Sequence, residues 1–200
     1  MARSSEFISS AVRIMKIAVV GGIGSGKSEV MRAVRDMGIA TLNADEINSE
    51  LLATPSYIAT IKNLFPTAVK DGEINRKELA RIVFSDKTAR EALNEVAHPL
   101  ILQKIKDDKR SPLVVEVPLI FESGAKDLFD VIVAIDTPLD KRIERLESGR
   151  NMTRDEVLAR IDSQVDEDEY LQIADHVIQN DGTLGDLKKC AKVLFLALCR

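Results

Sequence analysis

The sequence predicts an α/β protein in which a five-stranded parallel sheet lies between two layers of helices and carries two helical insertions. Short apolar runs alternate with segments of helical periodicity, which is the pattern of βαβ units. Val and Ile fill consecutive positions of these runs, as expected for strands that helices cover on both faces. The predicted strands are residues 16–20, 39–42, 113–117, 131–135 and 176–179.

Length, charge and cysteine content exclude several classes of protein. A chain of 200 residues can bury the core of one domain with insertions. Its formal net charge of -4 makes a nucleic-acid partner a poor expectation. No apolar run is long enough to span a bilayer, so we expect no membrane partner. Cys190 and Cys199 suit neither a zinc site nor a disulfide framework, which favours reduced thiols in a cytoplasmic protein.

The first 14 residues differ from the rest of the chain. They are rich in serine and lack the apolar centre of a signal peptide. Met15 stands immediately before the first predicted strand. We therefore interpret residues 1–14 as a leader foreign to the fold and Met15 as the native start.

The first strand leads directly into a phosphate-binding motif. Gly21, Gly26, Lys27 and Ser28 fill the fixed positions of G-x-x-x-x-G-K-[ST]. Glycine lets backbone amides approach phosphate oxygens, Lys27 would reach the β- and γ-phosphates, and Ser28 would ligate Mg²⁺. The alternative is a glycine-rich turn without a ligand. We expect ATP and Mg²⁺ to be bound here. The loop residues predicted to contact ATP are Gly22, Ile23, Gly24, Ser25, Gly26, Lys27, Ser28 and Glu29.

Asp45 is the candidate catalytic group on the acceptor side. The helix after the loop should run to about Met37 and end at Gly38, before the second strand. Asn43-Ala44-Asp45 follows that strand, at the edge of a parallel sheet where ligands bind. Asp45 either accepts a proton from an attacking hydroxyl or caps a helix over residues 46–53. Position alone leaves both roles open.

Residues 44–110 are too many for one crossover helix and predict an inserted helical lobe. Asp71-Gly72 marks a turn, and Asn75 with Glu78 predicts the start of a helix over residues 75–84. We expect Ser85 to cap the next helix and Pro99 to interrupt it near His98. The nucleotide-binding core then consists of residues 15–43, 111–137 and 172–200.

Residues 138–171 form a second insertion that is dense in charge. Thr153 and Glu156 predict a capping box in it. Arginines alternate there with acidic residues, so they are expected either to reach phosphates or to form ion pairs on helix surfaces. Arg145 and Arg150 are our first choices for contacts with ATP. The other arginines of this segment are Arg142, Arg154 and Arg160.

Beyond the loop, the chain resembles the dephospho-CoA kinases. That family combines a G-G-I-G-S-G-K-S loop with a D-A-D-x-I segment, which reads Asn43-Ala44-Asp45-Glu46-Ile47 here. The first Asp of the family segment is therefore Asn43, which lacks the charge for a role in water-mediated Mg²⁺ binding. The resemblance continues through residues 71–72, 76, 81–84, 93–94, 98–101, 117–122, 160–164 and 178–182.

The resemblance implies a P-loop kinase fold and a specific reaction. ATP phosphorylates the ribose 3′-hydroxyl of dephospho-coenzyme A to give coenzyme A and ADP, the last step of coenzyme A biosynthesis. Residues 44–110 become the substrate lobe and residues 138–171 a closing lid. The same resemblance implies Asp45 as the base, with Arg76 and His98 as further substrate-binding residues. Arg76 could instead face water in a first helical turn, and His98 could be a packed or capping residue.

The sequence leaves open the role of Asn180 and two alternative functions. Asn180 follows the fifth strand and either contacts adenine through its backbone or belongs to a simple turn. A nucleoside monophosphate kinase shares the loop, lobe and lid, but Asn43-Ala44-Asp45 and His98-Pro99 argue against it. A P-loop regulatory ATPase would have no acceptor at all.

Overall fold

The computed structural model describes residues 14–117, 120–121, 124–150 and 152–199, with the backbone alone for Arg150. Our interpretation of residues 1–14 as a leader lies outside the described residues, apart from the last of them. Our expectation for residues 117–122 also falls partly on positions that are not described. Among the residues that are, no helix is both long and apolar enough to cross a membrane.

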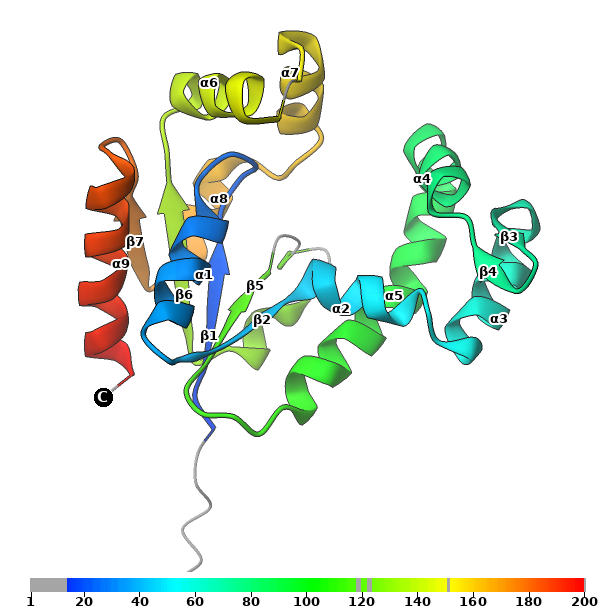
Figure 1. Ribbon diagram of the computed structural model, residues 1–200, viewed down its shortest axis with the longest axis horizontal. Coiled ribbons are helices and arrows are strands. Elements are labelled where there is room, and N and C mark those ends of the chain that lie inside the picture. The colour runs from blue at the N-terminus through cyan, green and yellow to red at the C-terminus, as the bar shows by residue number, and fades with distance from the viewer. Residues whose placement is uncertain (1–13, 118–119, 122–123, 151, 200) are drawn as a thin grey trace, which may run out of the picture.

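The predicted five-stranded parallel sheet is confirmed (Figure 1). Its order is β2-β5-β1-β6-β7, and every pairing is parallel. The central strand β1 is buried along its whole length. The strand bounds are β1 Lys16–Val20, β2 Ala40–Asn43, β5 Leu113–Glu116, β6 Val131–Asp136 and β7 His176–Gln179.

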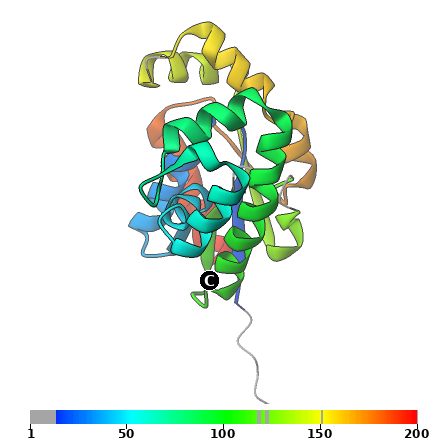
Figure 2. The ribbon, with the colours of Figure 1, turned by 90° about the vertical axis from the view of Figure 1, so that its right-hand side faces the viewer.

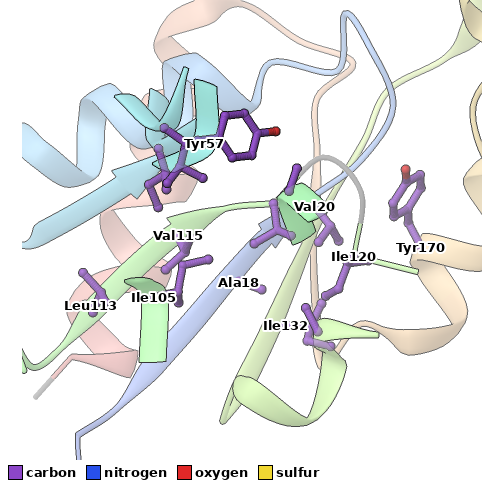
Figure 3. Packing of buried hydrophobic residues seen from close by; sticks show 14 of the residues in the cluster. Ala18, Val20, Tyr57, Ile105, Leu113, Val115, Ile120, Ile132 and Tyr170 are labelled. Atoms are coloured by element: carbon purple, nitrogen blue, oxygen red, sulfur yellow. The ribbon is translucent and has the colours of Figure 1, made fainter. Parts of the chain in front are cut away.

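Alternate residues of β1 belong to the cores on the two faces of the sheet, because successive side chains of a strand point to opposite faces. Ile17 and Val19 pack with helices α1 (Lys27–Asp36) and α9 (Leu184–Leu198). Ala18 and Val20 belong to the second core, which includes Ile105 (Figure 3). The sheet is therefore covered on both faces, as its Val- and Ile-rich strands predict.

The helical lobe projects from one side of the sheet in Figure 1. It consists of α2 (Ala44–Leu51), α3 (Pro55–Leu64), the short η1 (Pro66–Ala68), β3 (Val69–Lys70), β4 (Glu73–Ile74), α4 (Arg76–Ser85) and α5 (Lys87–Asp107). The predicted turn at Asp71-Gly72 joins β3 and β4. The sequence analysis did not predict these strands, because two residues are too few to show a period.

Two local predictions for the lobe are wrong. Asp86, not Ser85, caps α5, since its Oδ1 accepts from the amides of Thr88 and Ala89. The Ser85 hydroxyl instead donates back to carbonyls within α4. Helix α5 also runs through Pro99 without a break. Burial of Ala97 (5% exposed) and Ile105 (0%) holds the turns on either side of the proline in place.

The second insertion forms α6 (Leu139–Arg150), α7 (Arg154–Asp162) and α8 (Glu167–Ile173). The capping box of Thr153 and Glu156 is confirmed at the start of α7. Figures 1 and 2 show α6 and α7 above the loop that follows β1, whereas α8 returns to the sheet. A short helical turn, η2 (Ala125–Leu128), precedes β6. The insertion is thus positioned over the edge where the β-strands end.

The packing of α9 leads to a stability prediction. Phe195 is completely buried, whereas its neighbour Leu196 is 52% exposed. We expect Phe195→Ala to lower the free energy of unfolding by about 3–5 kcal/mol, because it removes a large buried ring and leaves a cavity. Leu196→Ala should change it by less than about 0.5 kcal/mol. Urea unfolding followed by circular dichroism checks this pair, and equal losses would contradict the assignment of α9 to the core.

Candidate active site

The phosphate-binding loop connects β1 to α1 and is shaped by glycine. Gly26 has a φ of +101°, in the left-handed region, and a Cβ there would lie 2.6 Å from the Asn180 side chain. A side chain at position 26 is therefore disfavoured by both conformation and space. Helix α1 begins at the next residue, Lys27, so the positive end of the helix faces the loop. This geometry suits an anion.

The far side of the loop is fixed by the sheet core. The Ser25 carbonyl accepts hydrogen bonds from Thr137 Oγ1 (2.9 Å) and Asn180 Nδ2 (2.7 Å). Asn180 is 2% exposed, and its backbone amide donates to the Asp136 carbonyl at 2.7 Å. Asn180 thus supports the loop from behind. Its contact with adenine stays a prediction.

The tip of the loop is held by the second insertion, residues 138–171, which is called the lid below. The Ile23 amide donates to Gln164 Oε1 at 2.7 Å, and its carbonyl accepts from Arg142 Nε at 2.9 Å. The Ile23 side chain packs against the small apolar cluster of the lid, which contains Leu146. Arg142 is 4% exposed and forms an ion pair with Glu167. Residue 23 is therefore held by its amide, its carbonyl and its side chain.

A cleft of about 530 Å³ opens between the loop, the lid and the ends of β2 and β5. It has the size of a small-ligand site. Lys27 lines the cleft from the start of α1, and Arg145 lines it from the lid. The lining residues are Ile23, Gly24, Gly26, Lys27, Ser28, Glu29, Asp45, Glu116, Arg145, Leu146, Gly149, Arg160 and Gln164.

Among the side chains that the structure describes, Lys27, Arg145 and Arg160 bring positive charge to the cleft. Lys27 Nζ donates to the carbonyls of Gly21 (2.8 Å) and Gly22 (3.0 Å). Arg145 Nη2 lies 3.3 Å from the Asn180 carbonyl oxygen, while its Nη1 is buried without a hydrogen-bond partner in the described part of the chain. A guanidinium with an unused donor suits phosphate oxygens.

Asn43 organises the acidic side of the cleft. Its Oδ1 accepts from the amides of Asp45 (2.8 Å) and Glu46 (3.3 Å), so Asn43 is the N-cap of α2. Its Nδ2 donates to Glu116 Oε2 at 3.0 Å. The alternative in which Asp45 caps a helix over residues 46–53 is therefore wrong. The helix begins two residues earlier, and Asp45 is not needed as its cap.

Asp45 and Glu116 are two carboxylates in one cleft with raised pKa values. Although Asp45 is exposed, partial loss of hydration raises its pKa, and attraction to Lys27 opposes the rise. Burial likewise raises the pKa of Glu116. The positive charge of Lys27 opposes this rise, and the negative charge of Asp45 adds to it. Perturbed carboxylates beside a lysine in a cleft are typical of catalytic sites.

A second, more apolar pocket adjoins the cleft between α2 and α5. Asp45 belongs to the lining of both cavities. His98 also lines the second pocket, as do apolar residues of α5. The full lining is Ala44, Asp45, Asn48, Leu93, Asn94, Ala97, His98, Ile101, Leu102, Ile105 and Val117. Asp45 therefore stands where a group bound in the lobe would meet a phosphate bound at the loop.

The structure brings most of the predicted site residues together, with exceptions. Arg76 is exposed at the start of α4, donates to the Ser49 carbonyl at 3.1 Å and lines neither cavity. The predicted side chain of Arg150 lies outside the described residues. Glu29 lines the cleft, although its amide donates to the Gly26 carbonyl and its carboxylate pairs with Arg32. Gly22, Ser25 and Asn180 do not line the cleft.

Sequence reasoning missed Glu116 and the role of Gln164. A single carboxylate that ends the otherwise apolar strand β5 was the available signal for Glu116. No comparable local signal marked Gln164, whose contact with Ile23 spans 141 residues of sequence.

The parallel sheet, the glycine loop before α1 and the cationic cleft beneath a helical lid define a P-loop kinase. A family model described as dephospho-CoA kinase matches residues 15–186. The chain belongs to the dephospho-CoA kinase family.

Individual relatives agree with this assignment. A dephospho-CoA kinase from Dehalococcoides mccartyi is 34% identical over 187 residues, which covers 89% of this chain and 94% of the relative. One from Thermus thermophilus is 35% identical over 186 residues, with 91% of each chain covered.

Solved structures support the same fold. A crystal structure from Thermus thermophilus matches with a TM-score of 0.79 and 34% identity, covering 93% of this chain and 98% of that one. A dephospho-CoA kinase from Campylobacter jejuni has a TM-score of 0.69, with 27% identity and coverage of 92% and 96%. A shikimate kinase from Acinetobacter baumannii, at 19% identity and a TM-score of 0.55, shares the fold.

The contacts of Ile23 lead to a prediction about nucleotide affinity. Arg142→Lys should weaken ATP binding about tenfold, because one ammonium cannot bond the Ile23 carbonyl and pair with Glu167 in the same geometry. Arg154→Lys is the matched control, since Arg154 is exposed and lies 3.8 Å from Glu147. Calorimetric titration with a non-hydrolysable ATP analogue measures both. Equal affinities would show that Arg142 does not support the loop.

Proposed function

We propose that this chain transfers the γ-phosphoryl group of ATP to the ribose 3′-hydroxyl of dephospho-CoA, giving CoA and ADP in the last step of coenzyme A biosynthesis. The position of Asp45 carries this proposal, because Asp45 lines both the cationic cleft and the pocket of the lobe. We propose a cytoplasmic setting for this reaction. Family membership names the acceptor, and the geometry supports a direct transfer between the two cavities.

In the proposed reaction, the 3′-oxygen attacks the γ-phosphorus while the bond from that phosphorus to the β,γ-bridging oxygen breaks. ADP leaves with the bond's electron pair, and the hydroxyl proton passes to the Asp45 carboxylate. Lys27 and Arg145 offset the negative charge on the phosphates. The loop amides orient ATP. Closure of the lid brings its arginines to the phosphates and excludes water.

The oxygen-bearing side chains of the cleft are suited to bind Mg²⁺. The described residues contain no cluster of three or more His, Cys, Asp or Glu side chains built to hold a metal. Mg²⁺ in kinases is instead held by few protein oxygens together with substrate phosphates. The Ser28 hydroxyl and the Glu116 carboxylate, both in the cleft, are the proposed protein ligands. When bound, the ion supplies positive charge to the β- and γ-phosphates.

Other residues have proposed roles in holding the two substrates. Arg145 and Arg150 of α6 would contact ATP phosphates, and the backbone of Asn180 would contact adenine. His98, in the lobe pocket, would contact dephospho-CoA. Arg76 is exposed at the start of α4, and its proposed partner is a phosphate of the acceptor.

A panel of acceptors tests the proposed function directly. ADP release should be faster with dephospho-CoA than with AMP, CMP or shikimate, measured in a coupled assay at equal concentrations. Comparable or faster turnover of a nucleoside monophosphate would replace the proposal with a nucleoside monophosphate kinase. ATP hydrolysis that no acceptor accelerates would indicate a P-loop ATPase instead.

Substitution of Asp45 separates catalysis from stability. Asp45→Asn should lower kcat by about 10²–10⁴-fold while ATP affinity stays the same, because the proton acceptor is lost. Partial loss of hydration raises the pKa of Asp45, so folding favours its protonated form. Its contribution to stability is therefore present at low pH and is lost as pH rises through the folded pKa. At neutral pH the variant should be at least as stable as the wild type by thermal unfolding.

The pH profile gives a second measure of the same residue. The wild-type kcat/KM should fall as pH drops through the raised pKa of Asp45, since only the carboxylate accepts a proton. The acid limb should therefore lie above the ordinary value of an aspartate, and Asp45→Asn should remove the part that Asp45 contributes and leave only that of Glu116. An unchanged kcat or an unchanged acid limb in the variant would rule out the base role.

A further inference from the structure

Asn48 has a buried polar atom that the protein does not satisfy. Its side-chain Oδ1 is inaccessible to solvent and has no hydrogen-bond partner among the residues that the structure describes. The residue lines the lobe pocket, where most of its neighbours are apolar side chains of α5. A buried acceptor without a donor is unfavourable, and a ligand or an ordered water can supply the missing donor.

Other asparagines of this chain show what a structural role looks like. The Asn75 side chain accepts from the Glu78 amide at 3.1 Å and caps α4. Asn43 and Asn180 also use their side chains in bonds to the protein. The Asn48 oxygen is the exception among these four, and Asn48 belongs to the lining of a cavity.

Asn48 lies one turn after Asp45 on α2. Residues three apart share a helix face, with Cβ atoms about 5–6 Å apart. Both residues line the same pocket. A ligand hydroxyl that reaches the Asp45 carboxylate therefore brings its nearest neighbouring groups within reach of Asn48.

This step rests on the proposed function, in which the hydroxyl at Asp45 is the ribose 3′-hydroxyl. The nearest polar neighbour of that group is the vicinal 2′-hydroxyl, on the adjacent carbon of the ring. A hydroxyl can donate to an amide oxygen. Asp45 and Asn48 lie one turn apart in the same pocket, where the two hydroxyls of a cis-diol could each meet one acceptor side chain.

We propose that Asn48 is a specificity-determining residue whose amide oxygen accepts a hydrogen bond from the 2′-hydroxyl of the acceptor ribose. Asp45 and Asn48 together then select an intact ribose over a deoxyribose. Binding of the 2′-hydroxyl to Asn48 leaves the 3′-oxygen at Asp45, which directs phosphoryl transfer to that position.

The test compares dephospho-CoA with its 2′-deoxy analogue on the wild type and on Asn48→Leu, which has a similar volume but no acceptor. The wild type should prefer the ribose substrate about tenfold in kcat/KM, as expected for one neutral hydrogen bond. In Asn48→Leu, the KM for dephospho-CoA should rise about tenfold, the analogue should be unaffected, and the preference should vanish.

Controls distinguish recognition from a structural role. Ser49→Ala, at an exposed neighbour on the same helix, should keep the wild-type preference. Asn48→Asp retains an acceptor oxygen and should also keep it, which provides a second variant should leucine prevent folding. The thermal midpoint of Asn48→Leu should equal or exceed that of the wild type, because an unsatisfied buried acceptor is removed.

The outcomes separate this inference from the function beneath it. If the wild type phosphorylates dephospho-CoA but does not distinguish the 2′-deoxy analogue, or if Asn48→Leu keeps the wild-type preference, the role of Asn48 is wrong and the proposed function stands. Loss of the preference in Asn48→Asp would also overturn the role. If the wild type does not phosphorylate dephospho-CoA, the proposed function and this inference both fail.

Discussion

The rest of the structure depends on one constraint: the backbone between β1 and α1 must present its amides to a single point. Such a loop has no side-chain core of its own, so its shape must be imposed by neighbours. The sheet core holds the Ser25 carbonyl through Thr137 and Asn180. The lid holds Ile23 through Gln164 and Arg142. Glycine at positions 22 and 26 provides the space that these side chains occupy.

The acidic edge of the cleft follows from sheet register. Parallel pairing of β2 with β5 places Asn43 opposite Glu116. An aspartate at position 43 would have put a carboxylate where the Asn43 amide now donates to Glu116 Oε2. Asn43 caps α2 through its side-chain oxygen and donates to Glu116 through its side-chain nitrogen. An ionised aspartate could make the first contact but has no donor for the second. The carboxylate of Asp45 then remains available to a ligand.

Much of the fold and part of the site could be predicted from local signals. The apolar runs specified the strands, and Gly38 and Thr153 marked the end of α1 and the start of α7. Pro99 misled the analysis because burial of Ala97 and Ile105 outweighs one missing hydrogen bond. Glu116 and Gln164 could not be placed because their partners are 73 and 141 residues away. Such roles are created by register and lid packing, which no local pattern encodes.

Ile23 connects the phosphate-binding loop to the lid through three contacts. Its side chain packs in the apolar cluster of the lid, while its amide and carbonyl belong to the loop. A phosphate that draws the loop amides toward itself must therefore carry the lid with it or break these bonds. Arg145 lies on α6, which also contributes Leu146 to that cluster, and its side chain lines the cleft. Ile23 therefore links the position of the loop tip to that of the lid helices α6 and α7.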